Sequence, residues 1–136
     1  MYLLDTNILS EFIKRKPNAN LLARLGSEPA HTLSTSCICI MELRFGSALR
    51  EDFEIFWQII TKEILYRVNI LPIGEKEVLA AGDILAGLRK TGQKIGLEDV
   101  LIAASAITNQ FTMVTANTCH FSRITGLQLE NWLEKE

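Results

Sequence analysis

The sequence has 136 residues, which suits one domain and leaves no room for a second. Apolar residues make up 48% of it and charged residues 22%, as in a globular protein with a core, and no apolar run approaches the roughly 18 residues of a membrane span. The formal net charge of −2 excludes a chain that attracts a polyanion over its whole surface, so any nucleic acid would have to meet local basic groups, metal ions or a partner subunit.

The N-terminal quarter begins with an apolar run. Tyr2–Asp5 is predicted to form a buried strand, and Thr6–Lys16 the helix that follows it and ends before Pro17. Leu21–Leu25 is predicted to be part of a second short helix, which ends at Gly26. The order is therefore strand, helix, helix.

The middle of the chain repeats this alternation. Thr32–Thr35 is a predicted strand, and Ser36 is a suitable N-cap for a helix that extends to about Arg50. Asp52–Leu65 carries apolar residues at helical spacing, and Val68–Ile73 is the next predicted strand. Strands and helices again follow one another in turn.

The C-terminal part has the same pattern. A long helix is predicted over Glu75–Lys90, ending at Gly92, and Leu97–Thr108 is a helix too apolar to lie on a surface. Thr112–Thr115 is a predicted strand and Gln128–Trp132 a last edge strand. Alternating strands and helices predict an α/β fold with a parallel sheet covered on both faces.

Ligands of such sheets bind beyond the carboxyl ends of the strands, where the strand order reverses. Asp5 lies at the end of the first predicted strand, and Thr115 and Asn117 lie at the end of the fourth. An Asp after a strand is commonly a helix N-cap, and for Asp5 taken alone this interpretation is favoured over a catalytic one. An aspartyl-phosphate phosphatase is not indicated, because the second Asp it needs two residues later is Asn7 here.

Glu42 is harder to explain as a structural residue. On its predicted helix it shares a face with Ile38, Phe45 and Leu49, and a carboxylate on an apolar stripe is costly to bury without a cation or donors. Arg44 is a poor partner, because residues two apart on a helix point in different directions. A buried salt bridge to a distant arginine remains open.

Asp99 raises the same question. Its neighbours on the helix are Ile102, Ala103 and Ala106. It also falls in the first turn, where the helix dipole favours an anion, and this structural explanation applies to Glu98 as well. Glu98 points about 100° away from the apolar stripe, so only Asp99 is kept as a site candidate.

Three carboxylates close together cannot all stay ionised without a cation. Oxygen ligands of this kind suit Mg²⁺ or Mn²⁺. Such an ion activates a water molecule and neutralises charge on a phosphate, so Asp5, Glu42 and Asp99 together predict metal-assisted phosphodiester hydrolysis. Zinc is not expected, because Cys37, Cys39, Cys119 and the two histidines lack the paired spacing of its ligands. No serine–histidine or cysteine–histidine system competes as a nucleophile.

Four segments of the sequence carry a family resemblance. It resembles the PIN-domain ribonucleases, and among them the VapC-type toxins of type II toxin–antitoxin pairs, at Leu3–Glu11, Met41–Gly46, Ile95–Ala104 and Val114–Phe121. The resemblance covers nearly the whole chain. It implies a single PIN domain over residues 1–136, a three-layer α/β/α sandwich with a short parallel sheet.

The resemblance also implies roles for single residues. Asp5, Glu42 and Asp99 would bind Mg²⁺, with Mn²⁺ as a substitute, and Thr115 would support Asp5 by hydrogen bonding. A fourth family position, often Asp, is Asn117 here, which brings no charge for a second ion. The family often has proline where this chain has Leu97-Glu98 and histidine where it has Ser105, and neither change touches the three acids.

Partners are implied in the same way. An RNA substrate, an antitoxin protein and a homodimer are expected. The cytoplasm is the expected location on a separate ground, because the sequence shows no charged-then-apolar leader and no membrane span. The candidates for phosphate contact are basic residues outside the predicted core: Lys14, Arg15, Lys16, Lys90 and Lys94. The candidates for an antitoxin groove are apolar: Phe12, Ile13 and Leu21–Leu25.

The leading hypothesis is an endoribonuclease that cuts single-stranded or loop RNA, because an open carboxylate site must reach an unpaired backbone. A nuclease acting on DNA keeps the same metal site and is the first alternative. A nucleic-acid-binding regulatory module with negligible cleavage is the second, and Asn117 is the feature that favours it.

Overall fold

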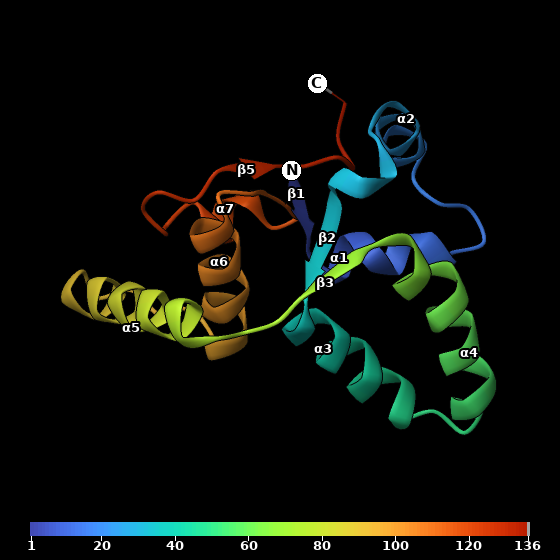
Figure 1. Ribbon diagram of the computed structural model, residues 1–136, viewed down its shortest axis with the longest axis horizontal. Helices are drawn as coiled ribbons and strands as arrows, with labels where there is room; N and C mark the ends of the chain where they lie inside the picture. Colours follow the sequence, from blue (N-terminus) through green and yellow to red (C-terminus); the bar gives the residue numbers. More distant parts are fainter. Residues whose placement is uncertain (136) are drawn as a thin grey trace.

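The computed structural model describes residues 1–135 and contains a five-stranded sheet in which every neighbouring pair of strands is parallel (Figure 1). The strand order is β3-β2-β1-β4-β5. In chain order the strands are β1 (Tyr2–Leu4), β2 (Leu33–Ser36), β3 (Asn69–Leu71), β4 (Thr112–Val114) and β5 (Leu129–Glu130). The predicted α/β class with a short parallel sheet is confirmed.

The helices form the outer layers of the sandwich. The α-helices are α1 (Thr6–Leu9), α2 (Ala19–Ser27), α3 (Cys37–Ala48), α4 (Phe53–Glu63), α5 (Glu75–Lys90), α6 (Leu97–Asn109) and α7 (Thr118–Phe121). Three short 3-10 helices are η1 (Ser10–Ile13), η2 (Ala30–Thr32) and η3 (Leu65–Arg67). Figure 1 shows α1, α2 and α4 on one side of the central strands and α5 and α6 on the other.

The direction of the chain explains this division. The chain runs from β1 to β2 to β3 and then returns to β4 on the other side of β1. Because parallel crossovers are right-handed, reversing the direction moves the connecting helices to the opposite face. The strand order therefore reverses between β1 and β4, which is where an α/β sheet opens a ligand site.

Helix α6 is the most deeply buried helix, as its composition predicted. Ile102, Ala103, Ala104 and Ala106 are fully buried, and the small alanines allow α5 to pack closely on it. Helix α3 begins at the carboxyl end of β2 and contacts α1, α4 and α6. The carboxyl edge of the sheet is therefore surrounded by α1, α3 and α6.

The predicted first helix, Thr6–Lys16, is wrong in its second half. The α-helix ends at Leu9, a 3-10 turn follows over Ser10–Ile13, and residues 14–16 are not helical. Ser10 Oγ donates to the Thr6 carbonyl at 2.9 Å, a local bond that competes with a regular helix. Glu11 is buried, pairs with Lys14 and accepts a hydrogen bond from the Asn18 backbone, which turns the chain away.

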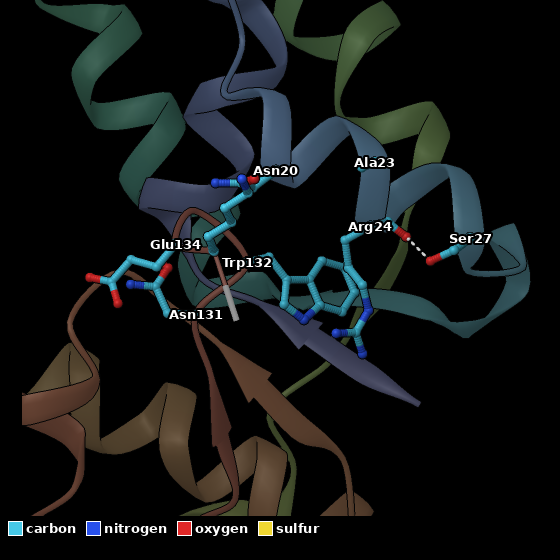
Figure 2. A pocket seen from close by; sticks show the side chains of 8 residues that line it. Asn20, Ala23, Arg24, Ser27, Asn131, Trp132 and Glu134 are labelled. Atoms are coloured by element: carbon cyan, nitrogen blue, oxygen red, sulfur yellow. Dashed lines mark hydrogen bonds between the residues drawn. The ribbon is translucent and has the colours of Figure 1, made fainter.

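Trp132 fixes the C-terminal segment to the start of the chain and to α2, and Figure 2 shows its ring beside Arg24 of α2. Its indole is 3% exposed, meets the Tyr2 ring edge-on at a centroid distance of 4.8 Å, and lies 4.8 Å from the Arg24 guanidinium of α2. Arg24 also pairs with Glu28 and Glu130 at 3.0 Å. This cluster ties α2 to the end of the sheet. Among residues 1–135, no helix is both long enough and apolar enough to cross a membrane.

Ser105 gives a first testable prediction, about stability. Its hydroxyl is buried in α6 and is the one fully buried side-chain polar atom of residues 1–135 that has no hydrogen-bond partner. Such a group costs about 1–3 kcal/mol, so Ser105→Ala should raise the free energy of unfolding by about 1 kcal/mol in urea denaturation. Ser47→Ala is the control, because the buried Ser47 hydroxyl donates to the Leu43 carbonyl at 2.7 Å and its loss should not stabilise. A destabilised Ser105→Ala protein would show that the hydroxyl has a partner.

Candidate active site

Asp5 lies at the point where the strand order reverses. It follows β1 directly, and its backbone N–H donates to the Val114 carbonyl of β4 at 2.9 Å. Its carbonyl accepts the N–H groups of Ile8 and Leu9, the first hydrogen bonds of α1. The side chain is thereby fixed between the ends of the two central strands.

Three donors hold the Asp5 carboxylate. Oδ1 accepts the Thr6 N–H at 2.8 Å, and Oδ2 accepts the Thr115 hydroxyl at 2.8 Å and the Asn7 amide at 3.2 Å. Burial nevertheless raises the pKa of Asp5, and the charge of Asp99 raises it further. Asp5 is therefore the N-cap of α1, which confirms the structural interpretation, and it is also an acid whose ionised form is disfavoured by burial.

Glu42, which belongs to α3, lies next to Asp5. Its Oε1 accepts the Thr6 hydroxyl at 3.0 Å, so Thr6 bridges the two carboxylates. Burial raises the pKa of Glu42, followed by the charges of Asp5, Asp99 and Glu98. No salt bridge to Glu42 is present within residues 1–135, so the alternative of a buried ion pair is not supported.

Arg44 does not face Glu42, as predicted from its spacing, and packs over the rings of Phe53 and Trp57 at 4.4 and 4.8 Å. The apolar stripe around Glu42 was predicted to be buried, but it is not part of the core. Phe45 is 63% exposed and Leu49 is 74% exposed. Helix α3 leaves the edge of the sheet, so this face of the helix points away from the core.

Asp99 is in the first turn of α6, and Ile102, Ala103 and Ala106 of the same helix are fully buried. Its own side chain is 36% exposed. Its Oδ2 lies 3.0 Å from Nε2 of His120. Because the Asp99 charge raises the pKa of both Asp5 and Glu42, the three acids lie within electrostatic reach of one another.

The sulfur of Cys39 also lies in this cluster. One ligand atom from each of Asp5, Cys39 and Glu42 lies within 4.8 Å of the others, and Asp99 lies outside this close group. Burial raises the pKa of the Cys39 thiol to about 12, with the Asp5 charge as the next cause. A protonated thiol is a poor ligand, and Mg²⁺ prefers oxygen, so Cys39 is a buried apolar neighbour of the site.

The carboxylate oxygens fit a divalent cation. Glu42 Oε2 and Asp99 Oδ1 form no hydrogen bond with another described residue, and Asp5 Oδ1 has a single donor. Each therefore keeps lone pairs available. Neither Asp5 nor Glu42 forms an ion pair with another described residue, so oxygen atoms from these acids and Asp99 form a set that a hard cation would stabilise.

The accessory candidates divide into two kinds. Thr115 is fully buried and supports Asp5 directly, whereas Asn117 is exposed and its side chain bonds to no other described residue. The Asn117 N–H donates to the Thr115 hydroxyl at 3.0 Å, which keeps that hydroxyl turned toward Asp5. Glu98, left out by the sequence argument, lies beside Glu42 on the rim of the site.

The remaining candidates lie outside this cluster. All five basic residues proposed for phosphate contact are exposed: Lys14, Arg15, Lys16, Lys90 and Lys94. Lys14 pairs with Glu11, so its charge is already partly compensated. Two other residues, which were not predicted from the sequence, lie at the site. His120 lies beside Asp99, and Arg123 lies beside His120.

The raised pKa values predict how stability depends on pH and Mg²⁺. The pKa values of Asp5 and Glu42 lie above their ordinary 3.8 and 4.5, so these groups add stability at low pH and lose it as pH rises through their raised values. Mg²⁺ should offset that loss, and at 100 times its Kd it adds about 2.7 kcal/mol. Thermal unfolding should therefore show a larger Mg²⁺-induced rise in Tm at pH 7.5 than at pH 5.

The control for this effect is Glu42→Gln, which removes one of the repelling charges and keeps the oxygen that accepts from Thr6. Its Tm should depend less on both pH and Mg²⁺. A wild-type Tm that does not respond to Mg²⁺ at pH 7.5 would contradict the cation site.

Comparison with known proteins identifies the family of this chain. A family model described as the PIN domain matches residues 2–127. Ribonuclease VapC2 of Haemophilus influenzae is 36% identical over 132 residues, which cover 97% of this chain and 98% of that protein. A chain of VapBC2 from Rickettsia felis, solved bound to a DNA fragment from their promoter, has a TM-score of 0.84 and 34% identity over 96% of this chain and 98% of that one.

A third similarity is to FitAcB from Neisseria gonorrhoeae, with a TM-score of 0.89 and 28% identity over 99% of this chain and 100% of that one. The fold is a parallel α/β/α sandwich, and acids lie at the point where its strand order reverses. These two features define the class of protein. The chain belongs to the PIN-domain family, and within it to the VapC-type ribonuclease toxins of toxin–antitoxin systems.

Proposed function

We propose that this protein is a divalent-metal-dependent endoribonuclease, the toxic member of a toxin–antitoxin pair, built as a single PIN domain. The observation that carries the proposal is the placement of Asp5, Glu42 and Asp99 around one edge of the sheet, where burial and the neighbouring negative charges raise the pKa of Asp5 and of Glu42. Its relatives named as VapC ribonucleases support RNA as the substrate.

The three acids are assigned to the metal. Asp5 and Asp99 would hold Mg²⁺, or Mn²⁺ as a substitute, and Glu42 would complete the set or orient the attacking water. The bound ion supplies activation of water and neutralisation of charge on the phosphate. Thr115 holds Asp5 in place through the 2.8 Å bond to Oδ2.

Other residues act on the substrate. Asn117 is exposed next to Thr115, where its amide can orient a phosphate oxygen or water but adds no charge. The site is open at the carboxyl edge of the sheet, with Asp99 about one-third exposed at 36%. A backbone must be unpaired to enter such a site, which favours single-stranded or loop RNA.

A homodimer is supported by apolar surface beside the site. Met41 and Phe45 on α3 and Leu49 directly after it are exposed, and exposed apolar side chains gathered in one place can mark a protein contact. Glu42 lies on the same helix, so a second copy of the chain seated there would border the active site, and the exposed basic side chains of both copies could line one groove. The shared groove would then attract RNA.

An antitoxin is the second proposed partner. A hollow of about 360 Å³ is lined by Phe12, Leu25 and the 81% exposed Tyr66, on the side of the molecule that carries α2 and η3. Phe12 and Leu25 belong to the predicted docking region, whereas Leu21 is fully buried in the core. The relatives solved as VapBC complexes support a protein partner of this kind.

The experiment is cleavage by the purified full chain. Unstructured RNA and single-stranded DNA of the same sequence are each incubated with Mg²⁺, with Mn²⁺ and with EDTA. The proposal predicts that RNA is cut with either metal and that EDTA stops the reaction. Cleavage that persists in EDTA would contradict the metal site, and cleavage of DNA alone would contradict the substrate.

A further inference from the structure

The segment after β4 provides a hydrogen-bond donor to two of the three acids. Thr115 donates to Asp5 Oδ2 at 2.8 Å, and His120, five residues later, faces Asp99 Oδ2 at 3.0 Å. Helix α7 (Thr118–Phe121), which carries His120, is anchored by Phe121, whose ring is fully buried. The position of His120 is therefore fixed by the core.

Arg123 determines which nitrogen of His120 carries the proton. Arg123 Nη2 lies 2.8 Å from His120 Nδ1. A guanidinium has donors only, so Nδ1 must accept and the ring proton must be on Nε2, where it faces Asp99. Without Arg123, Nδ1 could carry the proton instead, and that tautomer would turn an acceptor toward the carboxylate.

Arg123 is itself held in place by two further bonds. Its Nε donates to the His120 carbonyl at 3.1 Å, and its Nη1 donates to the Lys94 carbonyl at 3.1 Å, in the loop before α6. These hydrogen bonds therefore connect the start of α6, which carries Asp99, with the end of α7. The chain of contacts runs from Lys94 through Arg123 and His120 to Asp99.

We propose that His120, oriented by Arg123, is a positioning residue for the proposed metal ligand Asp99. The Nε2–H bond occupies Oδ2 of Asp99 and fixes the carboxylate plane, which leaves Oδ1 for the cation. This inference rests on the proposed metal-dependent function and adds to it a residue pair outside the acidic set. Partners that hold a metal ligand in this way are typically worth 10–100-fold in metal affinity.

The test is Mn²⁺ affinity of the full chain without substrate, measured by titrating the electron paramagnetic resonance signal of free Mn²⁺. His120→Ala should weaken binding by about 10–100-fold. His120→Gln should restore most of it, because the Gln side-chain N–H can occupy the place of Nε2–H. Arg123→Met should weaken binding although it does not touch Asp99.

Cys119→Ala is the matched control, since Cys119 is an exposed neighbour on the same turn. It should bind Mn²⁺ as the wild type does. Thermal unfolding of each variant shows whether the fold is intact, and a structural role alone would lower Tm without a difference between Gln and Ala in Mn²⁺ affinity.

The outcomes separate the two proposals. A wild type that binds no Mn²⁺ would overturn the metal site and this inference with it. A wild type that binds Mn²⁺, with His120→Ala binding it equally well, would overturn the role of His120 alone. Equal weakening in the Gln and Ala variants would also overturn it, because the N–H donor would then not matter.

Discussion

Replacing Asp5 with asparagine should reduce RNA cleavage by at least about 10²-fold while the protein stays folded, because removing a preorganised charge group from a reaction centre typically costs 10²–10³-fold. Asn keeps an oxygen for the Thr6 N–H, so the cap of α1 is preserved. It removes the negative charge at the centre of the site and turns an NH₂ group toward donors at Asn7 and Thr115. Single-turnover cleavage of a fluorogenic RNA measures the loss.

Asp83→Asn is the matched control, because Asp83 is an exposed acid on α5 and not part of the acidic cluster. It removes the same charge from the whole protein and should leave the cleavage rate unchanged. Wild-type activity in Asp5→Asn would mean that the reaction takes place elsewhere on the molecule.

Replacing Trp132 with alanine should have the largest effect on stability. The indole is 3% exposed and contacts both Tyr2 and Arg24, and removing a buried tryptophan typically costs 3–5 kcal/mol. The indole N–H also donates to Glu130 at 3.2 Å, a bond that is lost with the ring. The corresponding fall in Tm is roughly 10–15 °C for a chain of this size, measured by circular dichroism.

Trp57→Ala provides the comparison, since Trp57 is the other tryptophan and is only half-buried on α4. Its loss should cost clearly less than the loss of Trp132. Equal or smaller destabilisation by Trp132→Ala would show that the C-terminal segment is not an essential part of the core.

Strands β1 and β4 were predictable because their apolar residues, Leu3-Leu4 and Met113-Val114, are followed directly by a polar residue. Tyr2-Leu3-Leu4 before Asp5 is the clearest case, and the alternation with helices was enough to predict the parallel α/β sheet. The end of the first helix was not predictable in this way. It depends on Glu11, whose contacts to Lys14 and Asn18 form only when the chain has already turned.

The reason for which Glu42 was predicted to be a site residue was partly wrong. The sequence suggested a carboxylate on a buried stripe, whereas Phe45 and Leu49 are exposed. What makes Glu42 unusual is its nearness to Asp5 and Asp99, which belong to other elements. The corresponding prediction for Asp99 agrees better with the structure, because its helix neighbours Ile102 and Ala106 are buried.

His120 could not be found from spacing. It lies 21 residues after Asp99 along the chain, and the order and register of β1 and β4 bring the segment that carries it to the acids. A lone histidine in a short polar segment carries no periodic signal. The neighbouring aromatic residue Phe121 is the one local hint that this segment is anchored to the core.

The most direct test of the site is anomalous diffraction from a crystal of this protein soaked in Mn²⁺. We expect one strong Mn²⁺ peak with oxygen ligands from Asp5 and Asp99 and with Glu42 bound directly or through water. A peak bound by Cys39 sulfur without Asp99, or no peak near these acids at saturating Mn²⁺, would contradict it.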